Sequence, residues 1–149
     1  ATGATFAAEE GGCMAECGSA SGMAAAALVV MSGGSTEQAL AATSQALQNS
    51  FGMTCDTVAN RVEAPCLGKN TMAAANALAA ANMALAGFDP LIPLDEVIVA
   101  MAEVGRQMPR ELRCTGLGGI AVCPSSKAIE KRLVDAESKP DDATANLVH

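Results

Sequence analysis

The chain has 149 residues with a formal net charge of −7, and half of it is hydrophobic although it contains three Phe, no Trp and no Tyr. The acidic balance argues against nucleic acid or an anionic membrane surface as a partner, because both bind through basic patches. The longest apolar stretch, 23–31, is too short to span a bilayer, and no secretory signal is visible, so we expect a cytoplasmic protein without a membrane partner.

The apolar residues are mostly Ala, Leu, Val and Met, and β-branched residues are few and scattered. Ala, Leu and Met are strong helix formers, so the composition predicts an all-α fold, a compact helical bundle. Small side chains favour close packing of helices but leave little bulk to fill a core. We therefore expect the helices to need a large partner surface and the protein to be an oligomer.

The first half of the chain predicts two helices after a flexible start. Residues 1–12 are small and contain glycine, which indicates a loop. Residues 18–31 are apolar nearly all round, as in a buried helix. A second helix is predicted over 35–50, because Gln38 follows Ser35 at the spacing of a capping box.

The second half alternates between helices and irregular segments. Residues 53–69 have no clean helical period and contain a proline and two cysteines, so we predict an irregular loop there. Helices are expected over about 70–86 and 94–107, each ended by glycine or proline. Residues 126–137 are charged and predict a surface helix, followed by a disordered tail over 140–149.

Six cysteines carry the clearest chemistry in the sequence. With no secretory signal visible, metal or redox roles are favoured over three disulfides. Cys13, Cys17, Cys55 and Cys66 lie at predicted helix starts or breaks, whereas a core cysteine usually falls on an apolar stripe. The one histidine, His149, is terminal, which argues against histidine catalysis and His-ligated metals. Spacing alone supports thiolate ligation of a soft metal or an iron–sulfur cluster about as well as structural or redox cysteines.

Several stretches in unbroken order over residues 9–124 resemble the bacterial iron–sulfur-dependent L-serine dehydratases, above all their separate α-chain form. They are GGCMAECGSASGMAAA around Cys13, FGMTCDTVA around Cys55, VEAPCLGKNTM around Cys66, AAANALAAANMALAG, PLDEVIVAMAEVGRQMP and LRCTGLGGIA. The resemblance implies one helical domain of that α-chain type over 13–124, with the surface helix and tail over 125–149 outside it.

In that family three cysteines hold a [4Fe–4S] cluster, and the resemblance places them at Cys13, Cys55 and Cys66. Cys17 matches a cysteine of the α-chain form only and is expected beside the site. Cys114 and Cys123 stand where Glu and Thr are expected, so they are not predicted as ligands. Three thiolates leave one iron open as a Lewis acid for the hydroxyl of L-serine, and the implied products are pyruvate and ammonia.

Polar residues near these motifs are candidates for the substrate site. Asp56, Asn70 and Thr115 are proposed to contact L-serine or to hydrogen-bond around the cluster, although each residue type is also common in turns and helix caps. The general base is not identified. The family also carries a β chain or N-terminal domain that contributes to the substrate site, and we expect this chain to need that partner.

Two other functions stay open at the level of sequence. The chain could be a non-catalytic helical interaction module that keeps the fold without the cluster. It could also be a related cluster lyase acting on cysteine or another β-substituted amino acid, because the substrate pocket is shared with residues outside the chain.

Overall fold

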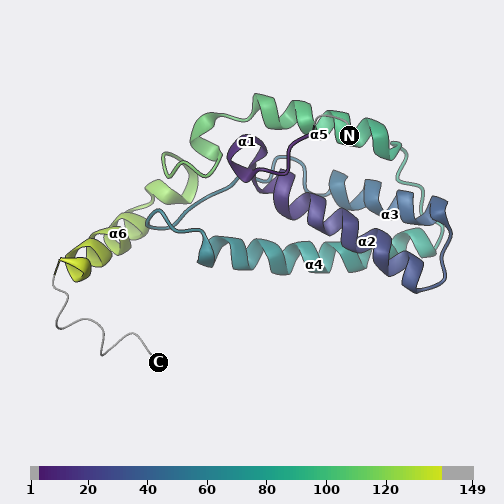
Figure 1. Cartoon of the computed structure of the whole chain (residues 1–149), viewed down its shortest axis with the longest axis horizontal. Helices are drawn as coiled ribbons and strands as arrows, with labels where there is room; N and C mark the ends of the chain where they lie inside the picture. The colour runs from purple at the N-terminus through teal and green to yellow at the C-terminus, as the bar shows by residue number, and fades with distance from the viewer. Residues whose placement is uncertain (1–3, 139–149) are drawn as a thin grey trace.

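The computed structural model describes residues 4–138, and within that range it is helical and contains no β-sheet (Figure 1). An elongated bundle is formed by α2 (Ser19–Met31), α3 (Thr36–Gln48), α4 (Glu63–Leu85) and α5 (Leu94–Gln107). Helix α2 packs against both α3 and α4, and α5 packs against α3. The prediction of an all-α fold is confirmed.

Helix α3 begins at the predicted capping box. The backbone N–H of Gln38 donates to Ser35 Oγ at 3.2 Å, and the backbone N–H of Ser35 donates to Gln38 Oε1 at 2.9 Å. The two side chains thus satisfy two donors that the helix leaves free at its start. Gln38 Nε2 also donates to the Ala84 carbonyl at 3.2 Å, so the same cap ties α3 to the end of α4.

Small residues build the interior of the bundle. Ala25 of α2, Ala42 of α3 and Ala80 of α4 belong to one core cluster, and none of them exposes any surface. Because most side chains at this core are small, the helices approach closely, and Ser21 Oγ donates to the Ala73 carbonyl at 2.8 Å across the α2–α4 contact. The close helix packing expected from composition is therefore present.

The helical structure begins earlier than predicted. Helix α1 (Ala8–Cys13) and a π-helical turn η1 (Met14–Gly18) precede α2. The loop predicted over 1–12 is therefore wrong for residues 8–12, whereas residues 4–7 are irregular and the first three lie outside the described range. Gly12 has a φ of +68°, and a Cβ at this position would lie 2.7 Å from the Met53 carbonyl oxygen. The glycine therefore permits a close approach of two backbones, which sequence reasoning mistook for flexibility.

Helix α4 also begins earlier than predicted. Its first residue is Glu63, so the loop predicted over 53–69 ends sooner, and the predicted helix extends toward the N-terminus. Pro65 lies in the first turn, where its missing N–H interrupts no intrahelical hydrogen bond. The N–H of Cys66 donates to the Val62 carbonyl at 2.8 Å, which places this cysteine on a helix and not in a loop.

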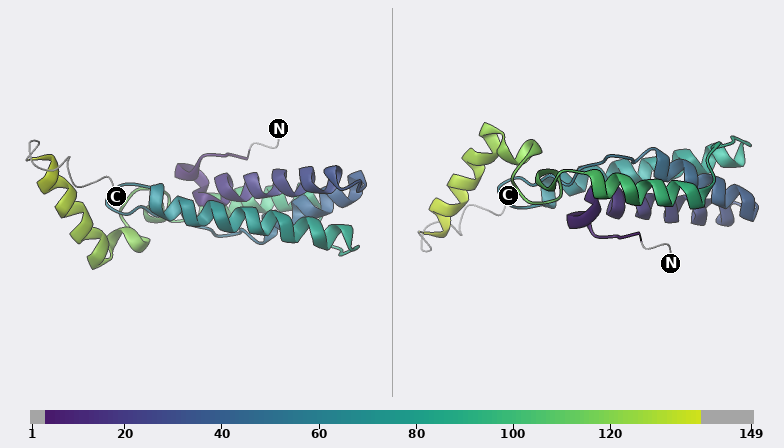
Figure 2. Two further views of the ribbon diagram at one scale, coloured as in Figure 1. Left: turned by 90° about the horizontal axis from the view of Figure 1, so that it is seen from below. Right: turned by 90° about the horizontal axis from the view of Figure 1, so that it is seen from above.

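The C-terminal part leaves the bundle. Two short 3₁₀ turns, η2 (Arg110–Leu112) and η3 (Gly119–Val122), lead to α6 (Pro124–Glu137), which confirms the helix predicted over 126–137. Figure 2 shows α6 projecting from one end of the bundle. The tail predicted over 140–149 lies outside the described residues.

One helical run, Ala8–Met31, is long and apolar enough by length and composition to cross a membrane. In the folded chain, however, 56% of its most apolar window is buried. The central helix of a packed bundle meets the same two criteria, so the run is weak evidence for a membrane segment.

Candidate metal centre

Three cysteines far apart in the sequence meet at one end of the bundle. The Sγ atoms of Cys13, Cys55 and Cys66 all lie within 4.8 Å of one another. Cys13 and Cys55 are buried, and Cys66 is half-buried. Thiolates are soft ligands that suit iron–sulfur clusters and zinc, so this arrangement can hold a metal ion or a cluster.

The backbone of each cysteine is positioned by a different element. Cys13 ends α1, and the N–H of Met14 next to it donates to the Met53 carbonyl at 3.0 Å. Cys55 lies in the loop after α3, where its N–H donates to the Leu112 carbonyl at 3.0 Å. Cys66 occupies the start of α4. The site therefore forms only when α1, the loop and α4 pack together.

Burial raises the pKa of the two buried thiols of the group, Cys13 and Cys55. It raises the pKa of Cys13 to about 11, although contact with the Cys55 thiol and the charge of Lys69 both act to lower it. The pKa of Cys55 is raised by burial first, and then by its contacts with the thiols of Cys114 and Cys13. Because metals bind the thiolate forms, metal binding at Cys13 and Cys55 must release protons.

Lys69 brings a positive charge to the site. It lies one helical turn after Cys66 on α4, and its Nζ donates to the Thr54 carbonyl at 2.6 Å. Burial raises the pKa of both Cys13 and Cys17, and the charge of Lys69 opposes that rise. Sequence reasoning missed this role, for which the three-residue spacing from Cys66 was the available signal.

Replacing Lys69 with methionine is expected to weaken metal retention at the site. Methionine keeps a long side chain but removes the charge that favours thiolates, which should cost on the order of 1 kcal/mol. Loss of a bound metal ion or cluster to a chelator under anaerobic conditions should then be roughly five times faster. Lys69→Arg keeps the charge and serves as the matched control. Equal rates of metal loss in the two variants would show that the charge of Lys69 does not help to retain the metal.

The other cysteines lie outside the group of three. Cys17 is buried and its thiol contacts that of Cys13, and it also borders a cavity of ≈100 Å³. Cys114 is half-buried and contacts Cys55, a neighbour that sequence reasoning missed. Cys123 is exposed at the start of α6.

The three candidate substrate residues, Asp56, Asn70 and Thr115, differ in whether their side-chain atoms are already hydrogen-bonded within the chain. Asn70 is exposed on α4, and its Nδ2 donates to the Cys66 carbonyl at 2.8 Å. Thr115 Oγ1 donates to the Arg110 carbonyl at 3.1 Å. Asp56 Oδ2 accepts a hydrogen bond from a neighbouring threonine, whereas its buried Oδ1 has no partner among the described residues. Asp56 is therefore the one of the three whose side chain keeps an unused charged oxygen beside a site cysteine.

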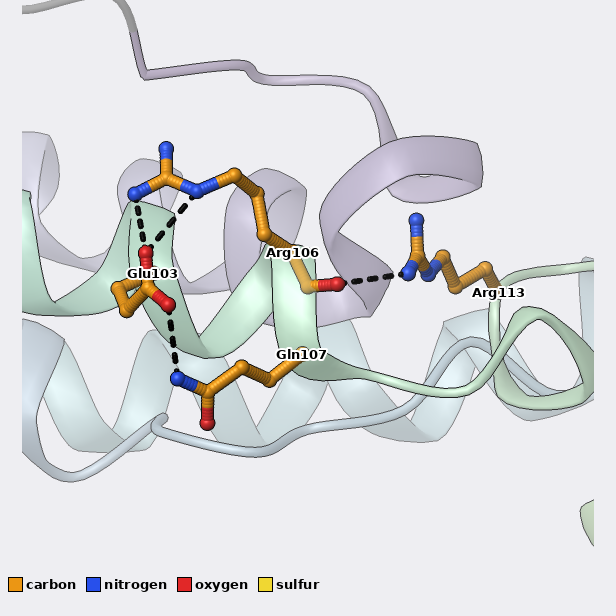
Figure 3. A network of polar contacts seen from close by, with 4 residues as sticks. All are labelled: Glu103, Arg106, Gln107 and Arg113. Carbon is orange, nitrogen blue, oxygen red and sulfur yellow. Dashed lines mark hydrogen bonds and ion pairs between the residues drawn. The ribbon is translucent and has the colours of Figure 1, made fainter.

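Arg113 anchors the segment that supports Cys55. One of its nitrogens donates to the Arg106 carbonyl at 3.1 Å, at the C-terminal end of α5 (Figure 3). On the same turn, Gln107 Nε2 donates to Glu103 Oε1 at 2.8 Å, and Arg106 pairs with Glu103. The hydrogen bond from Gln107 and the pairing with Arg106 hold the pKa of Glu103 below its usual range. Arg113 itself pairs with Cys55 in a short parallel β-bridge, so α5 helps to fix this cysteine.

Comparison with known proteins gives a consistent result. Residues 1–121 match the family described as serine dehydratase alpha chain. The chain is 51% identical over 133 residues to the probable L-serine dehydratase, alpha chain, of Bacillus subtilis (strain 168), covering 89% of this chain and 44% of the relative. It is 52% identical over 128 residues to the L-serine dehydratase, alpha chain, of Peptoniphilus asaccharolyticus, covering 86% of this chain and 44% of the relative. The chain is 41% identical over 120 residues to L-serine dehydratase 1 of Escherichia coli (strain K12), covering 80% of this chain and 26% of the relative. The chain thus spans less than half the length of these relatives.

Proposed function

The chain belongs to the serine dehydratase α-chain family, and from this premise we propose that it is the cluster-binding part of an L-serine dehydratase, which converts L-serine to pyruvate and ammonia. The observation that supports this most directly is the group of three Sγ atoms, Cys13, Cys55 and Cys66, within 4.8 Å of one another. We propose that these thiolates hold a [4Fe–4S] cluster.

The donor set fits such a cluster. A [4Fe–4S] cluster takes one thiolate per iron, and the described residues bring three thiols together, so a cluster held by them would keep one iron without a protein ligand. When bound, the cluster supplies a Lewis acid for the hydroxyl group of serine. Around it, the chain contributes burial, which excludes water from Cys13 and Cys55, and the charge of Lys69, which favours the thiolate forms.

Asp56, Asn70 and Thr115 are the residues that we propose to contact the substrate. The unpartnered carboxylate oxygen of Asp56 suits the ammonium group of an amino acid, because the two carry opposite charge. The carboxamide oxygen of Asn70 and the hydroxyl of Thr115 would accept or donate neutral hydrogen bonds. The group that removes the α-proton stays unassigned.

Replacing Asp56 with asparagine is expected to raise KM for serine. The change preserves size but removes the charge facing the ammonium group, a loss of about 1.5–3 kcal/mol, which corresponds to roughly 10- to 100-fold. Steady-state kinetics on the complete enzyme would measure KM, and bound iron would be measured in parallel. Iron content should stay unchanged. A loss of iron with unchanged KM would instead show that Asp56 positions Cys55 and does not contact the substrate.

The remainder of the enzyme is proposed to cover this chain and complete the substrate site. The chain spans 44% of two α-chain relatives, and the rest of the α chain together with a β chain or N-terminal domain would complete an oligomeric, cytoplasmic enzyme. The outer face of α4 supports this, because Leu67 beside Cys66 is 71% exposed and Leu78, about three turns further along the helix, is 55% exposed. Large apolar side chains on one helix face favour a protein partner.

Leu78→Glu is expected to weaken assembly with that partner or with a second copy. The variant places a charge on the exposed apolar face of α4 without touching the buried alanine core, so the chain should still fold. Sedimentation should show a smaller species than the unmodified protein forms at the same concentration. Lys131→Glu on the exposed side of α6 is the control, and identical sedimentation of the Leu78 variant and the unmodified protein would exclude this face.

The experiment that tests the function is anaerobic reconstitution followed by quantitation of iron and sulfide, with the rest of the enzyme present and absent. We expect about four irons per chain with an air-sensitive visible absorption, and pyruvate formation from serine when the enzyme is complete. If the protein takes up iron but turns over cysteine or another β-substituted amino acid in place of serine, serine is the wrong substrate. No iron under either condition would contradict the proposal and favour a non-catalytic interaction module.

A further inference from the structure

Cys114 lies against one of the proposed ligands. Its backbone N–H donates to the Cys55 carbonyl at 2.8 Å, and the N–H of Cys55 donates to the Leu112 carbonyl at 3.0 Å. The Cys114 side chain packs against the cluster of buried side chains that contains Cys55, and its thiol is close enough to raise the pKa of the Cys55 thiol. The backbone therefore holds these two thiols side by side.

Cys114 is not part of the ligand group. The sulfur atoms that all lie within 4.8 Å of one another are those of Cys13, Cys55 and Cys66. A cluster on these three would leave Cys114 as a free thiol next to Cys55. Once the cluster is lost, however, Cys55 becomes a free thiol as well, and its neighbour is already in contact with it.

We propose that Cys55 and Cys114 form a disulfide in the chain that has lost its cluster, and that this bond must be reduced before the site can be loaded again. The inference rests on the proposed function only in taking Cys55 as a ligand. The disulfide would protect a ligand sulfur from irreversible oxidation to sulfinic acid, because a disulfide can be returned to thiols by exchange.

The reaction needs an oxidant, which we take to be a small disulfide such as oxidised glutathione. The Cys114 thiolate attacks one glutathione sulfur, breaks the S–S bond and releases the first glutathione thiolate. The Cys55 thiolate then attacks the Cys114 sulfur and releases the second. The two protein thiols lose two protons and two electrons, and one oxidised glutathione becomes two reduced glutathione molecules. Cys114 reacts first because it is half-buried, whereas Cys55 is buried.

The Cys55–Cys114 pair is favoured over other pairs of cysteines in the site. Its two backbones are hydrogen-bonded to each other, so closing the bond requires little movement. The Sγ atoms of Cys13 and Cys66 also lie within 4.8 Å of that of Cys55, but these residues stand on α1 and α4, so bringing either of them to bonding distance means shifting a helix. Cys114 is also the half-buried thiol in contact with Cys55 that cluster binding leaves free.

Peptide mapping of the cluster-free chain after treatment with oxidised glutathione tests the proposal. Cleavage after glutamate separates the proposed ligands and Cys17 onto different fragments, with Cys55 on 38–63. Cys114 shares fragment 112–130 with Cys123, so the experiment uses Cys123→Ala. We expect fragments 38–63 and 112–130 to be joined without reduction and separated after it. A bond between any other pair, or glutathione adducts alone, would overturn the proposal.

Iron loading gives a second readout. The oxidised chain should take up little iron until a thiol reductant is added, whereas oxidised Cys114→Ala should load as well as the reduced protein. Equal loading of the oxidised protein with and without reductant would overturn the blocking role of the bond. If the reduced chain never loads iron, the proposed function fails, yet the mapped disulfide is still observed, so the two failures are distinguishable.

Discussion

Single replacement of Cys13, Cys55 or Cys66 by alanine is expected to reduce bound iron after anaerobic reconstitution from about four ions per chain to less than about one. The three Sγ atoms lie within 4.8 Å of one another, and the described residues place no fourth thiol within that distance of all three. A variant with two thiols cannot hold the cluster firmly, since each thiolate binds a separate iron. Iron and acid-labile sulfide per chain, together with the visible spectrum, measure the effect.

Cys123→Ala is the matched control for these variants. Cys123 is exposed at the start of α6, away from the three ligands, and its replacement should leave iron content unchanged. Far-ultraviolet circular dichroism of all variants would show that the helices persist, because the alanine core of α2, α3 and α4 does not include the ligands. Unchanged iron content in any of the three ligand variants would remove that cysteine from the set.

The helices of this chain could be predicted where the signal lies within one helical turn and does not depend on residues far away in the sequence. The capping box at Ser35 and Gln38 gave the start of α3 correctly, because both partners lie within one turn. Glycine and proline were less informative. Gly12 and Pro65 were taken as marks of loops, but Gly12 permits close backbone packing and Pro65 stands in the first turn of α4. Both roles depend on neighbours that the local sequence does not show.

The candidate site could be predicted only through the family resemblance. Spacing alone could not single out Cys13, Cys55 and Cys66, because they meet through the packing of α1, a loop and α4. Lys69 and Cys114 were missed for the same reason. Each approaches a site cysteine through three-dimensional contacts, and Cys114 does so from a segment nearly sixty residues after Cys55 along the chain.

Gly12→Ala is expected to cause a large loss of stability. A Cβ would lie 2.7 Å from the Met53 carbonyl oxygen and 2.9 Å from Met108, and the φ of +68° disfavours alanine by itself. Because the nearest atom belongs to the backbone, it cannot turn aside. We expect a loss of about 2–5 kcal/mol in the free energy of unfolding, measured by urea denaturation.

Gly12→Ala should also impair iron loading. The Met53 carbonyl accepts a hydrogen bond from the N–H of Met14 at 3.0 Å, so pushing this carbonyl away would displace the neighbouring Cys13. Gly52→Ala separates this effect from simple strain. Gly52 has a φ of +76°, but nothing lies within 4 Å of a Cβ placed there, so its cost should be limited to about 1–2 kcal/mol, with iron content unchanged. If both variants lost the same stability and the same iron, the close contact of Gly12 with Met53 would have no special role, and the position of Cys13 would have to be set by α1 and η1 alone.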